Sequence, residues 1–152
     1  MNIYKLITAS TWILPVITAV ILHELAHGYA ALRLGDDTAL KQGRLSFNPL
    51  KHIDPLGTII LPLFLVIVNS PFIYGWAKPV PVSLLRLKKP KTSMAIVAAA
   101  GPLVNIFLAF SAVVLLKLAS NFSLPDNELI GWVLINIRNA FIINLILAAF
   151  NL

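Results

Sequence analysis

Residues 6–27 read LITASTWILPVITAVILHELAH, a long apolar run that ends in three ionisable side chains. No residue from 6 to 22 carries a charge. A membrane-spanning helix needs about 20 mostly apolar residues, so this run is long enough to cross a bilayer. A secretory signal peptide has a shorter apolar part, followed by a small-residue cleavage site. The run therefore predicts a retained helix over residues 4–34, bent at Pro15.

The remainder of the chain is equally apolar. Of its 152 residues, 59% are hydrophobic and 12% are charged, whereas soluble domains carry about 25% charged residues. Two further charge-free stretches, residues 92–116 and 139–152, predict helices over 93–119 and 129–152, separated by a polar turn at 121–128. We therefore expect an all-α membrane protein with three core transmembrane helices, forming one integral-membrane domain over residues 1–152.

Residues 55–82 are apolar but contain seven prolines and glycines. Their most apolar part, residues 55–70, is shorter than the roughly 20 residues of a full span. It could still cross the membrane as a short helix, or it could enter and return. Basic loops lie on both sides of it, and Lys and Arg favour the cytoplasmic side. The charge pattern therefore favours the re-entrant arrangement, which requires a protein-lined cavity beside it.

The net charge of +6 comes from Lys and Arg in short loops, which is typical of membrane topology and gives no support to a nucleic-acid partner. The basic loops are expected in the cytoplasm, and the acidic turn with Asp126 and Glu128 outside. The chain has no cysteine, which excludes disulfides and thiolate zinc sites. The expected partners are the lipid bilayer and a membrane-protein or peptide substrate; the oligomeric state is left open.

His23-Glu24-Leu25-Ala26-His27 is an H-E-x-x-H sequence within the first predicted helix. Residues four apart share one helix face, so both imidazoles can reach one Zn²⁺. The adjacent Glu24 can act as general base toward a metal-activated water. A chance pair of core histidines is the alternative, but ionisable groups inside an apolar helix are costly and usually functional. Because a basic loop follows, we expect the site nearer the cytoplasmic face.

Several stretches in the same order resemble the site-2 protease family of intramembrane zinc metalloproteases (peptidase family M50), in its short prokaryotic branch. They are HELAHGYAALRLGD, GRLSFNPLKHIDPLGTI, GWAKPVPV, AAAGPLVN and the terminal FNL. The resemblance implies a three-helix core in a prokaryotic cell membrane, with zinc held by His23, His27 and an Asp, and with Glu24 as the base. That Asp belongs to an L-D-G motif that would follow Asn151. The motif is absent from this chain, which we therefore expect to be truncated at its C-terminus.

Other polar residues are candidates for shaping the site. His52 and Asp54 could supply a third ligand in place of the missing Asp, but a role in shaping the loop is favoured because ligands usually sit on rigid elements. Asn105 either joins two helices or faces the cavity, the second being the role that the G-P-x-x-N pattern of the family implies. Asn136, Asn144 and Asn151 are expected on one inward face of the last helix.

The segment Gly75–Val82 should be extended, since its prolines disrupt helices and regular ladders. The family resemblance implies that this edge, with Gly75 and Trp76, pairs with an unwound substrate strand. A proline-rich loop with an interfacial tryptophan is the simpler alternative.

Together these features predict an intramembrane zinc metalloendopeptidase that hydrolyses peptide bonds of membrane-protein substrates. A non-catalytic or truncated relative that binds membrane proteins without cleaving them is the main alternative. A metal transporter would predict inverted repeats, which the sequence lacks. A purely structural bundle would leave the His23, Glu24 and His27 spacing unexplained.

Overall fold

The structure, a computed structural model, describes residues 3–72 and 74–151. Within them, three helices are long and apolar enough to cross a membrane: α1 (Ile3–Arg33), α4 (Pro90–Ala119) and α5 (Glu128–Phe150). The helices predicted over 4–34, 93–119 and 129–152 are confirmed, although residue 152 lies outside the described residues. Helix α4 starts three residues earlier than predicted because Pro90 occupies its first turn, where proline needs no N–H partner.

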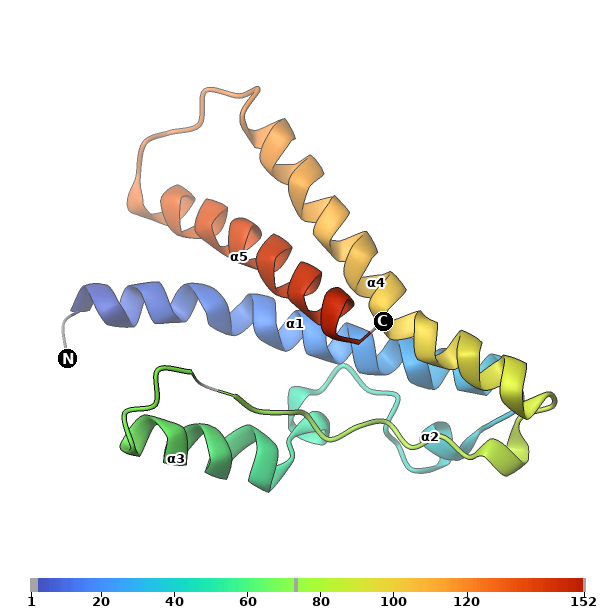
Figure 1. The fold of residues 1–152 in the computed structure, drawn as a ribbon. Coiled ribbons are helices and arrows are strands. Elements are labelled where there is room, and N and C mark those ends of the chain that lie inside the picture. Colours follow the sequence, from blue (N-terminus) through green and yellow to red (C-terminus); the bar gives the residue numbers. More distant parts are fainter. Residues whose placement is uncertain (1–2, 73, 152) are drawn as a thin grey trace.

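The three long helices pack against one another in every pairing, with α4 crossing α1 and α5 filling the angle between them (Figure 1). Small side chains line the contacts: Ala19 of α1, Ala109 and Ala112 of α4, and Ala148 of α5 are all buried. Small residues allow helix backbones to approach closely, which drives helix association where lipid removes the hydrophobic effect. The buried alanines therefore let the three helices pack tightly, while many of the large apolar side chains lie on the outer surface of the bundle.

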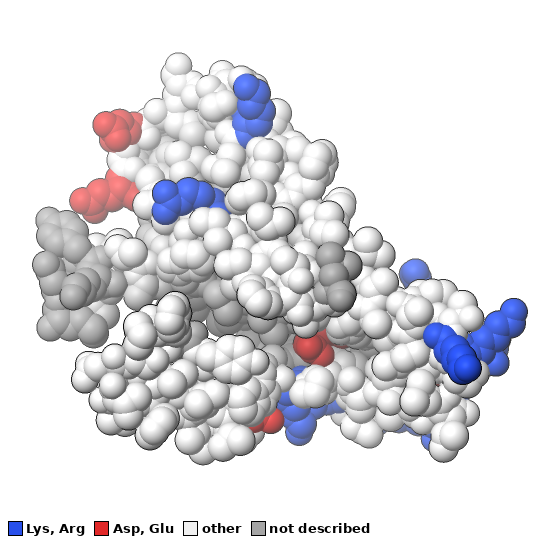
Figure 2. Space-filling view, in the orientation of Figure 1, with Lys and Arg blue, Asp and Glu red and all other residues white. Residues whose placement is uncertain are grey.

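The outer surface of the bundle is apolar. Large side chains such as Leu103, Phe107, Phe110 and Leu129 are each more than half exposed. Figure 2 shows a broad uncharged surface, with basic groups at the end where α4 begins and both acidic and basic groups at the opposite end. Such a surface is compatible with lipid rather than water around the middle of the molecule.

Residues 55–72 and 74–83 form the two arms of a hairpin beside the bundle. It runs out along the π-helical turn η2 (Pro55–Ile60) and α3 (Leu61–Ile67) and turns at Asn69, where φ is +52°. It then returns as an extended trace from residue 74 to 83 (Figure 1). The N–H of Trp76 donates to the carbonyl of Gly57 at 3.2 Å. The segment thus folds back to its own base, which is the shape that a re-entrant arrangement would have, and its returning arm is the predicted extended edge.

The two arms of the hairpin are packed closely, but its helix is otherwise isolated. A Cβ on Gly57 would lie 2.3 Å from the Trp76 ring, so the indole lies directly on the Gly57 backbone. Within the described residues, α3 makes no close backbone approach to α1, α4 or α5. The hairpin is therefore attached to the bundle through its base and its returning arm.

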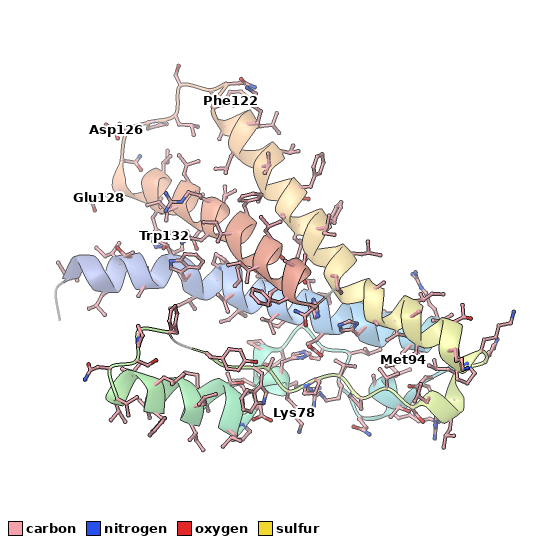
Figure 3. All side chains as sticks on the ribbon, viewed as in Figure 1. Lys78, Met94, Phe122, Asp126, Glu128 and Trp132 are labelled. Carbon is pink, nitrogen blue, oxygen red and sulfur yellow. The ribbon has the colours of Figure 1, made fainter. Side chains whose placement is uncertain are left out.

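Three short elements connect the longer ones on the side of the hairpin (Figure 1). They are α2 (Thr38–Lys41), η1 (Pro49–His52) and η3 (Leu84–Arg86). Figure 3 places Met94 near the start of α4, and Phe122, Asp126 and Glu128 at the far end of the bundle. The basic residues Lys88, Lys89 and Lys91 at the start of α4 are thus separated from the acidic turn by the length of that helix.

Candidate metal and catalytic centre

The two histidines of α1 face each other across one helical turn. Their Nε2 atoms are 2.9 Å apart, and their rings meet edge to face with centroids 4.6 Å apart. The helix places them there because residues i and i+4 lie one above the other. Two nitrogens that each bind one zinc at about 2.0–2.1 Å can be at most about 4 Å apart, so the observed spacing is compatible with a shared metal.

The other ring nitrogen of each histidine is held by α4. His27 Nδ1 lies 2.7 Å from the carbonyl oxygen of Val97, and His23 Nδ1 bonds to the side-chain oxygen of Asn105. A carbonyl can only accept, so His27 must carry its proton on Nδ1. His23 does the same with Asn105 as acceptor. Both Nε2 atoms then present lone pairs to each other, an arrangement that a bound cation relieves, and hydrogen bonds of this kind accompany metal-binding histidines.

Gly101 leaves the space in front of the two imidazoles open. A Cβ at this position would lie 2.5 Å from His27 Nε2 and 2.6 Å from His23 Cε1. Any other residue would therefore place its Cβ against the two rings, closest to the His27 nitrogen that would bind the metal. The residues present fit a zinc ion on three grounds: the spacing of the nitrogens, their tautomers, and the absence of a side chain at Gly101.

Glu24 lies between the histidines in sequence and turns toward the returning arm of the hairpin. Its carboxylate accepts a hydrogen bond from the backbone N–H of Val80 at 2.7 Å. The side chain is half-buried. The extended segment therefore passes directly beside the candidate base, and Glu24 links the helix with the two histidines to that segment.

The extended segment is held along one edge by alternate residues. Besides Val80, the N–H of Lys78 donates to the carbonyl of His52 at 2.9 Å, and Thr58 Oγ1 donates to the carbonyl of Trp76 at 2.8 Å. Arg44, which is buried, donates from Nη2 to the carbonyl of Lys78 at 2.8 Å. Alternate N–H groups of an extended chain point to opposite sides, so the other edge faces away from these partners.

Asp36 fixes the far end of the segment. It is fully buried, and its Oδ2 accepts from the N–H of Ser83 at 2.6 Å. Burial alone would raise the pKa of Asp36, but hydrogen bonds from Thr38 and Ser83, with the nearby Arg86, hold it below its usual value. Asp36 is therefore an ionised anchor between the end of α1 and the extended segment.

The structure places His52 and Asp54 outside the pair of histidines. Asp54 caps η2 by accepting from the N–H groups of Leu56 and Gly57, and His52 Nε2 bonds to the carbonyl of Ser46 at 2.7 Å. No group of three His, Cys, Asp or Glu side chains able to hold a metal occurs in residues 3–72 and 74–151. Both residues shape the loop beneath the extended segment, and neither completes a ligand set.

Two of the three asparagines predicted on the inward face of α5 lie there. Asn136 and Asn144 are buried, as predicted. Asn151 is exposed, and its amide donates to the carbonyl of Leu147 at 2.8 Å, so the expected inward position is wrong for that residue, which lies just beyond the last helical residue. Asn139, which the spacing did not indicate, is 1% exposed and donates to Thr11 Oγ1 at 2.9 Å.

Several residues of the site were not identified from the sequence. Gly101, Arg44 and Asp36 entered only as parts of the stretches that resemble the family, with no role of their own. Their partners are carbonyls, backbone N–H groups and rings far away in the chain, which no local pattern specifies. The one available signal was a charged residue next to a glycine in a loop, at Gly35-Asp36 and Gly43-Arg44.

Comparison with curated proteins finds relatives whose names describe zinc metalloproteases. The chain is 40% identical over 141 residues to "Putative zinc metalloprotease YwhC" of Bacillus subtilis (strain 168), a match covering 92% of the chain and 61% of that protein. It is 31% identical over 88 residues to "Putative zinc metalloprotease Rip2" of Mycolicibacterium smegmatis, covering 58% of the chain and 32% of that protein.

The chain thus spans less than two thirds of the length of either relative. No family model matches it, and no solved structure gives a significant match. The chain is a homologue of proteins named as zinc metalloproteases, and its H-E-x-x-H residues lie on a helix long and apolar enough to cross a membrane.

Proposed function

We propose that this chain is the catalytic part of an intramembrane zinc metalloprotease of the site-2 protease family, which cuts membrane proteins at or within the bilayer. The observation that carries the proposal is the pair of imidazole Nε2 atoms 2.9 Å apart. Their Nδ1 atoms are both engaged by α4. The names of the relatives support zinc as the metal.

His23 and His27 would supply two ligands to the ion. When bound, zinc would acidify water and polarise the scissile carbonyl. The remaining ligand is expected from the L-D-G motif of the family, outside the residues described here. Gly101 keeps the approach to the ion free, and the Val97 carbonyl and Asn105 hold the rings in position.

Glu24 would act as the general base. A base must lie within hydrogen-bond reach of the proton that it removes, and Glu24 is adjacent in sequence to a ligand histidine. The N–H of Val80 holds the carboxylate at 2.7 Å, which limits its freedom before reaction. Peptide hydrolysis then needs no covalent intermediate, because the carboxylate can take a proton from water and return it to the leaving amine.

The substrate would lie beside the extended segment as an unwound strand. The hydrogen bonds of Trp76, Lys78 and Val80 occupy one edge of this segment, so the opposite edge is the one on which a strand could add. Pro79 and Pro81 lack N–H groups, which limits pairing on that edge to the part around Gly75 and Ala77. A locally unwound transmembrane helix is the class of substrate that this edge suits.

The basic loops would lie in the cytoplasm and the acidic turn outside, following the bias of Lys and Arg toward the cytoplasmic side. His23 and His27 lie closer to the C-terminal end of α1 than to its N-terminal end, and α1 continues into the basic loop at residues 35–54. The centre would therefore lie nearer the cytoplasmic face of the membrane.

Replacing Glu24 by Gln tests the proposal. The amide cannot accept the proton, so cleavage should fall by at least about 100-fold, while zinc binding should persist because both histidines remain. The measurement is cleavage of a labelled single-span membrane protein with a glycine-containing helix, reconstituted with the enzyme in liposomes, alongside zinc content.

Glu128→Gln is the matched control, since Glu128 is an exposed carboxylate in the first turn of α5 at the opposite end of the molecule. It should cleave like the parent. A parent protein that binds zinc and the substrate without cleaving it would contradict the enzyme and favour a non-catalytic binding protein. Equal cleavage by the parent and Glu24→Gln would remove Glu24 from the mechanism.

A further inference from the structure

Helix α5 reaches His23 through two buried amides. Asn144 is 3% exposed and Asn105 is fully buried. The Asn105 Nδ2 atom donates to Asn144 Oδ1 at 2.6 Å, and the Asn105 oxygen bonds to His23 Nδ1. The three side chains form a continuous line from α5 through α4 to α1.

The direction of this line is set by a backbone carbonyl. Asn144 Nδ2 lies 2.8 Å from the carbonyl oxygen of Ala140, which can only accept. Asn144 must therefore direct its NH₂ at Ala140 and its oxygen at Asn105. Asn105 must then donate to Asn144 and direct its own oxygen at His23. This order follows from donor and acceptor chemistry, and it resolves the amide orientations that geometry alone leaves ambiguous.

A reversed Asn105 would close the metal site. Its NH₂ would donate to His23 Nδ1, so the His23 proton would move to Nε2 and could bond to His27 Nε2, 2.9 Å away. Both histidines would then be satisfied without a cation. That reversal would put the Asn105 oxygen against the Asn144 oxygen, however, and Asn144 cannot turn without facing the Ala140 carbonyl with an oxygen.

We propose that Asn144 is a positioning residue that, through Asn105, holds His23 with its proton on Nδ1 and its Nε2 open to a metal. Asn105 has a second acceptor, the carbonyl of Ala19, but at 3.4 Å this contact is long. The contact with Asn144 is the shorter of the two and decides the orientation. The inference rests on the proposed function for the identity of the metal, whereas the position of the proton is independent of it.

Asn144→Leu tests this in the metal-free protein. Leucine removes the acceptor, so Asn105 can reverse and the His23 proton should move largely to Nε2. Nitrogen NMR of the protein with ¹⁵N-labelled histidine reports the protonated nitrogen directly, and His23→Ala identifies the resonance. Asn136→Leu is the control, because Asn136 is also buried and also donates to a carbonyl four residues earlier, that of Trp132, at 2.9 Å. It should leave the His23 signal unchanged.

Zinc affinity, measured by chelator competition, gives the second readout. Residues that orient metal-binding histidines typically change affinity by 10- to 100-fold, and from its more distant position Asn144→Leu should weaken binding by about tenfold. Should the leucine variant not fold, Asn144→Ala removes the same acceptor with a smaller, helix-favouring side chain. Folding is judged by the unfolding temperature, which the control variant must match.

The outcomes separate the two ideas. The inference is supported if the His23 proton moves to Nε2 in Asn144→Leu but not in Asn136→Leu. This holds even if no variant binds zinc, a result that would contradict only the proposed metalloprotease function. An unchanged His23 signal in Asn144→Leu overturns the inference, whatever the zinc affinity. Equal shifts in Asn136→Leu and Asn144→Leu also overturn it, because they would show a general effect of removing an asparagine from α5.

Discussion

Two histidines four residues apart become a metal site only when both Nε2 atoms are free, and that depends on what bonds to Nδ1. The H-E-x-x-H spacing predicts the pair. Val97 offers a main-chain carbonyl at 2.7 Å, and Asn105 offers its side chain. A carbonyl acceptor has no signature in sequence, because every residue carries one. The pair of histidines could therefore be predicted from the H-E-x-x-H motif, but which nitrogen of each ring carries the proton could not.

Replacing the single residue Gly101 by alanine (Gly101→Ala) should abolish zinc binding. The new methyl group would lie 2.5 Å from His27 Nε2, in the space that a metal needs. Alanine otherwise favours a helix over glycine by roughly 0.5–1 kcal/mol, so the protein should remain folded. Zinc titration followed by thermal unfolding checks both expectations.

Gly131→Ala is the control for that substitution. Gly131 is also a helical glycine, and a Cβ there would meet nothing within 4 Å. This variant should bind zinc like the parent and unfold at the same or a higher temperature. Retained zinc binding in Gly101→Ala would mean that the ion approaches the histidines from another side.

Among the elements, the extended segment from residue 74 to 83 depends most on distant partners. It has no helix and no ladder of its own, so its position comes from Arg44, Asp36, Glu24 and the His52 carbonyl. Its prolines predicted the extended form, while the partners lie up to 56 residues away in sequence. The segment could be recognised in the sequence, but its place beside Glu24 could not.

The anchor at Asp36 should make stability depend on pH. The folded pKa of Asp36 lies below its usual value, so the carboxylate contributes stability above the ordinary Asp pKa of about 3.9 and loses it as the pH falls through the folded value. The unfolding temperature of the parent should exceed that of Asp36→Asn at neutral pH. The difference should begin to shrink below about pH 4, where Asp36 of the unfolded chain takes up a proton, and should be lost once the pH has fallen below the folded pKa. A difference that stays constant from neutral to acidic pH would show that the charge contributes nothing.

The apolar helices were the most predictable elements. The charge-free runs placed α1, α4 and α5 to within three residues, because a bilayer demands long uninterrupted apolar stretches. For residues 55–70 the charge pattern favoured a returning segment over a crossing one, and the contact of Trp76 with Gly57 shows that the chain folds back on itself there. Asn139 was missed because its partner is Thr11 on another helix, a pairing that spacing along one helix cannot indicate.

Considered as a whole, the molecule assembles its candidate centre from three helices. Helix α1 contributes His23, Glu24 and His27, α4 contributes Gly101 and Asn105, and α5 contributes Asn144 behind them. The pairwise packing of the three helices is therefore a condition for metal binding, since each supplies part of the site.

Zinc content and affinity of the purified, detergent-solubilised protein test the central claim most directly. The comparison is between the parent, His23→Ala, His27→Ala and His52→Ala, where His52 is the remaining histidine of the chain and bonds to Ser46 instead of the pair. We predict that the parent and His52→Ala bind zinc equally and that either of the other substitutions abolishes binding. A parent that binds no zinc, or zinc that persists without His23 and His27, would contradict the account.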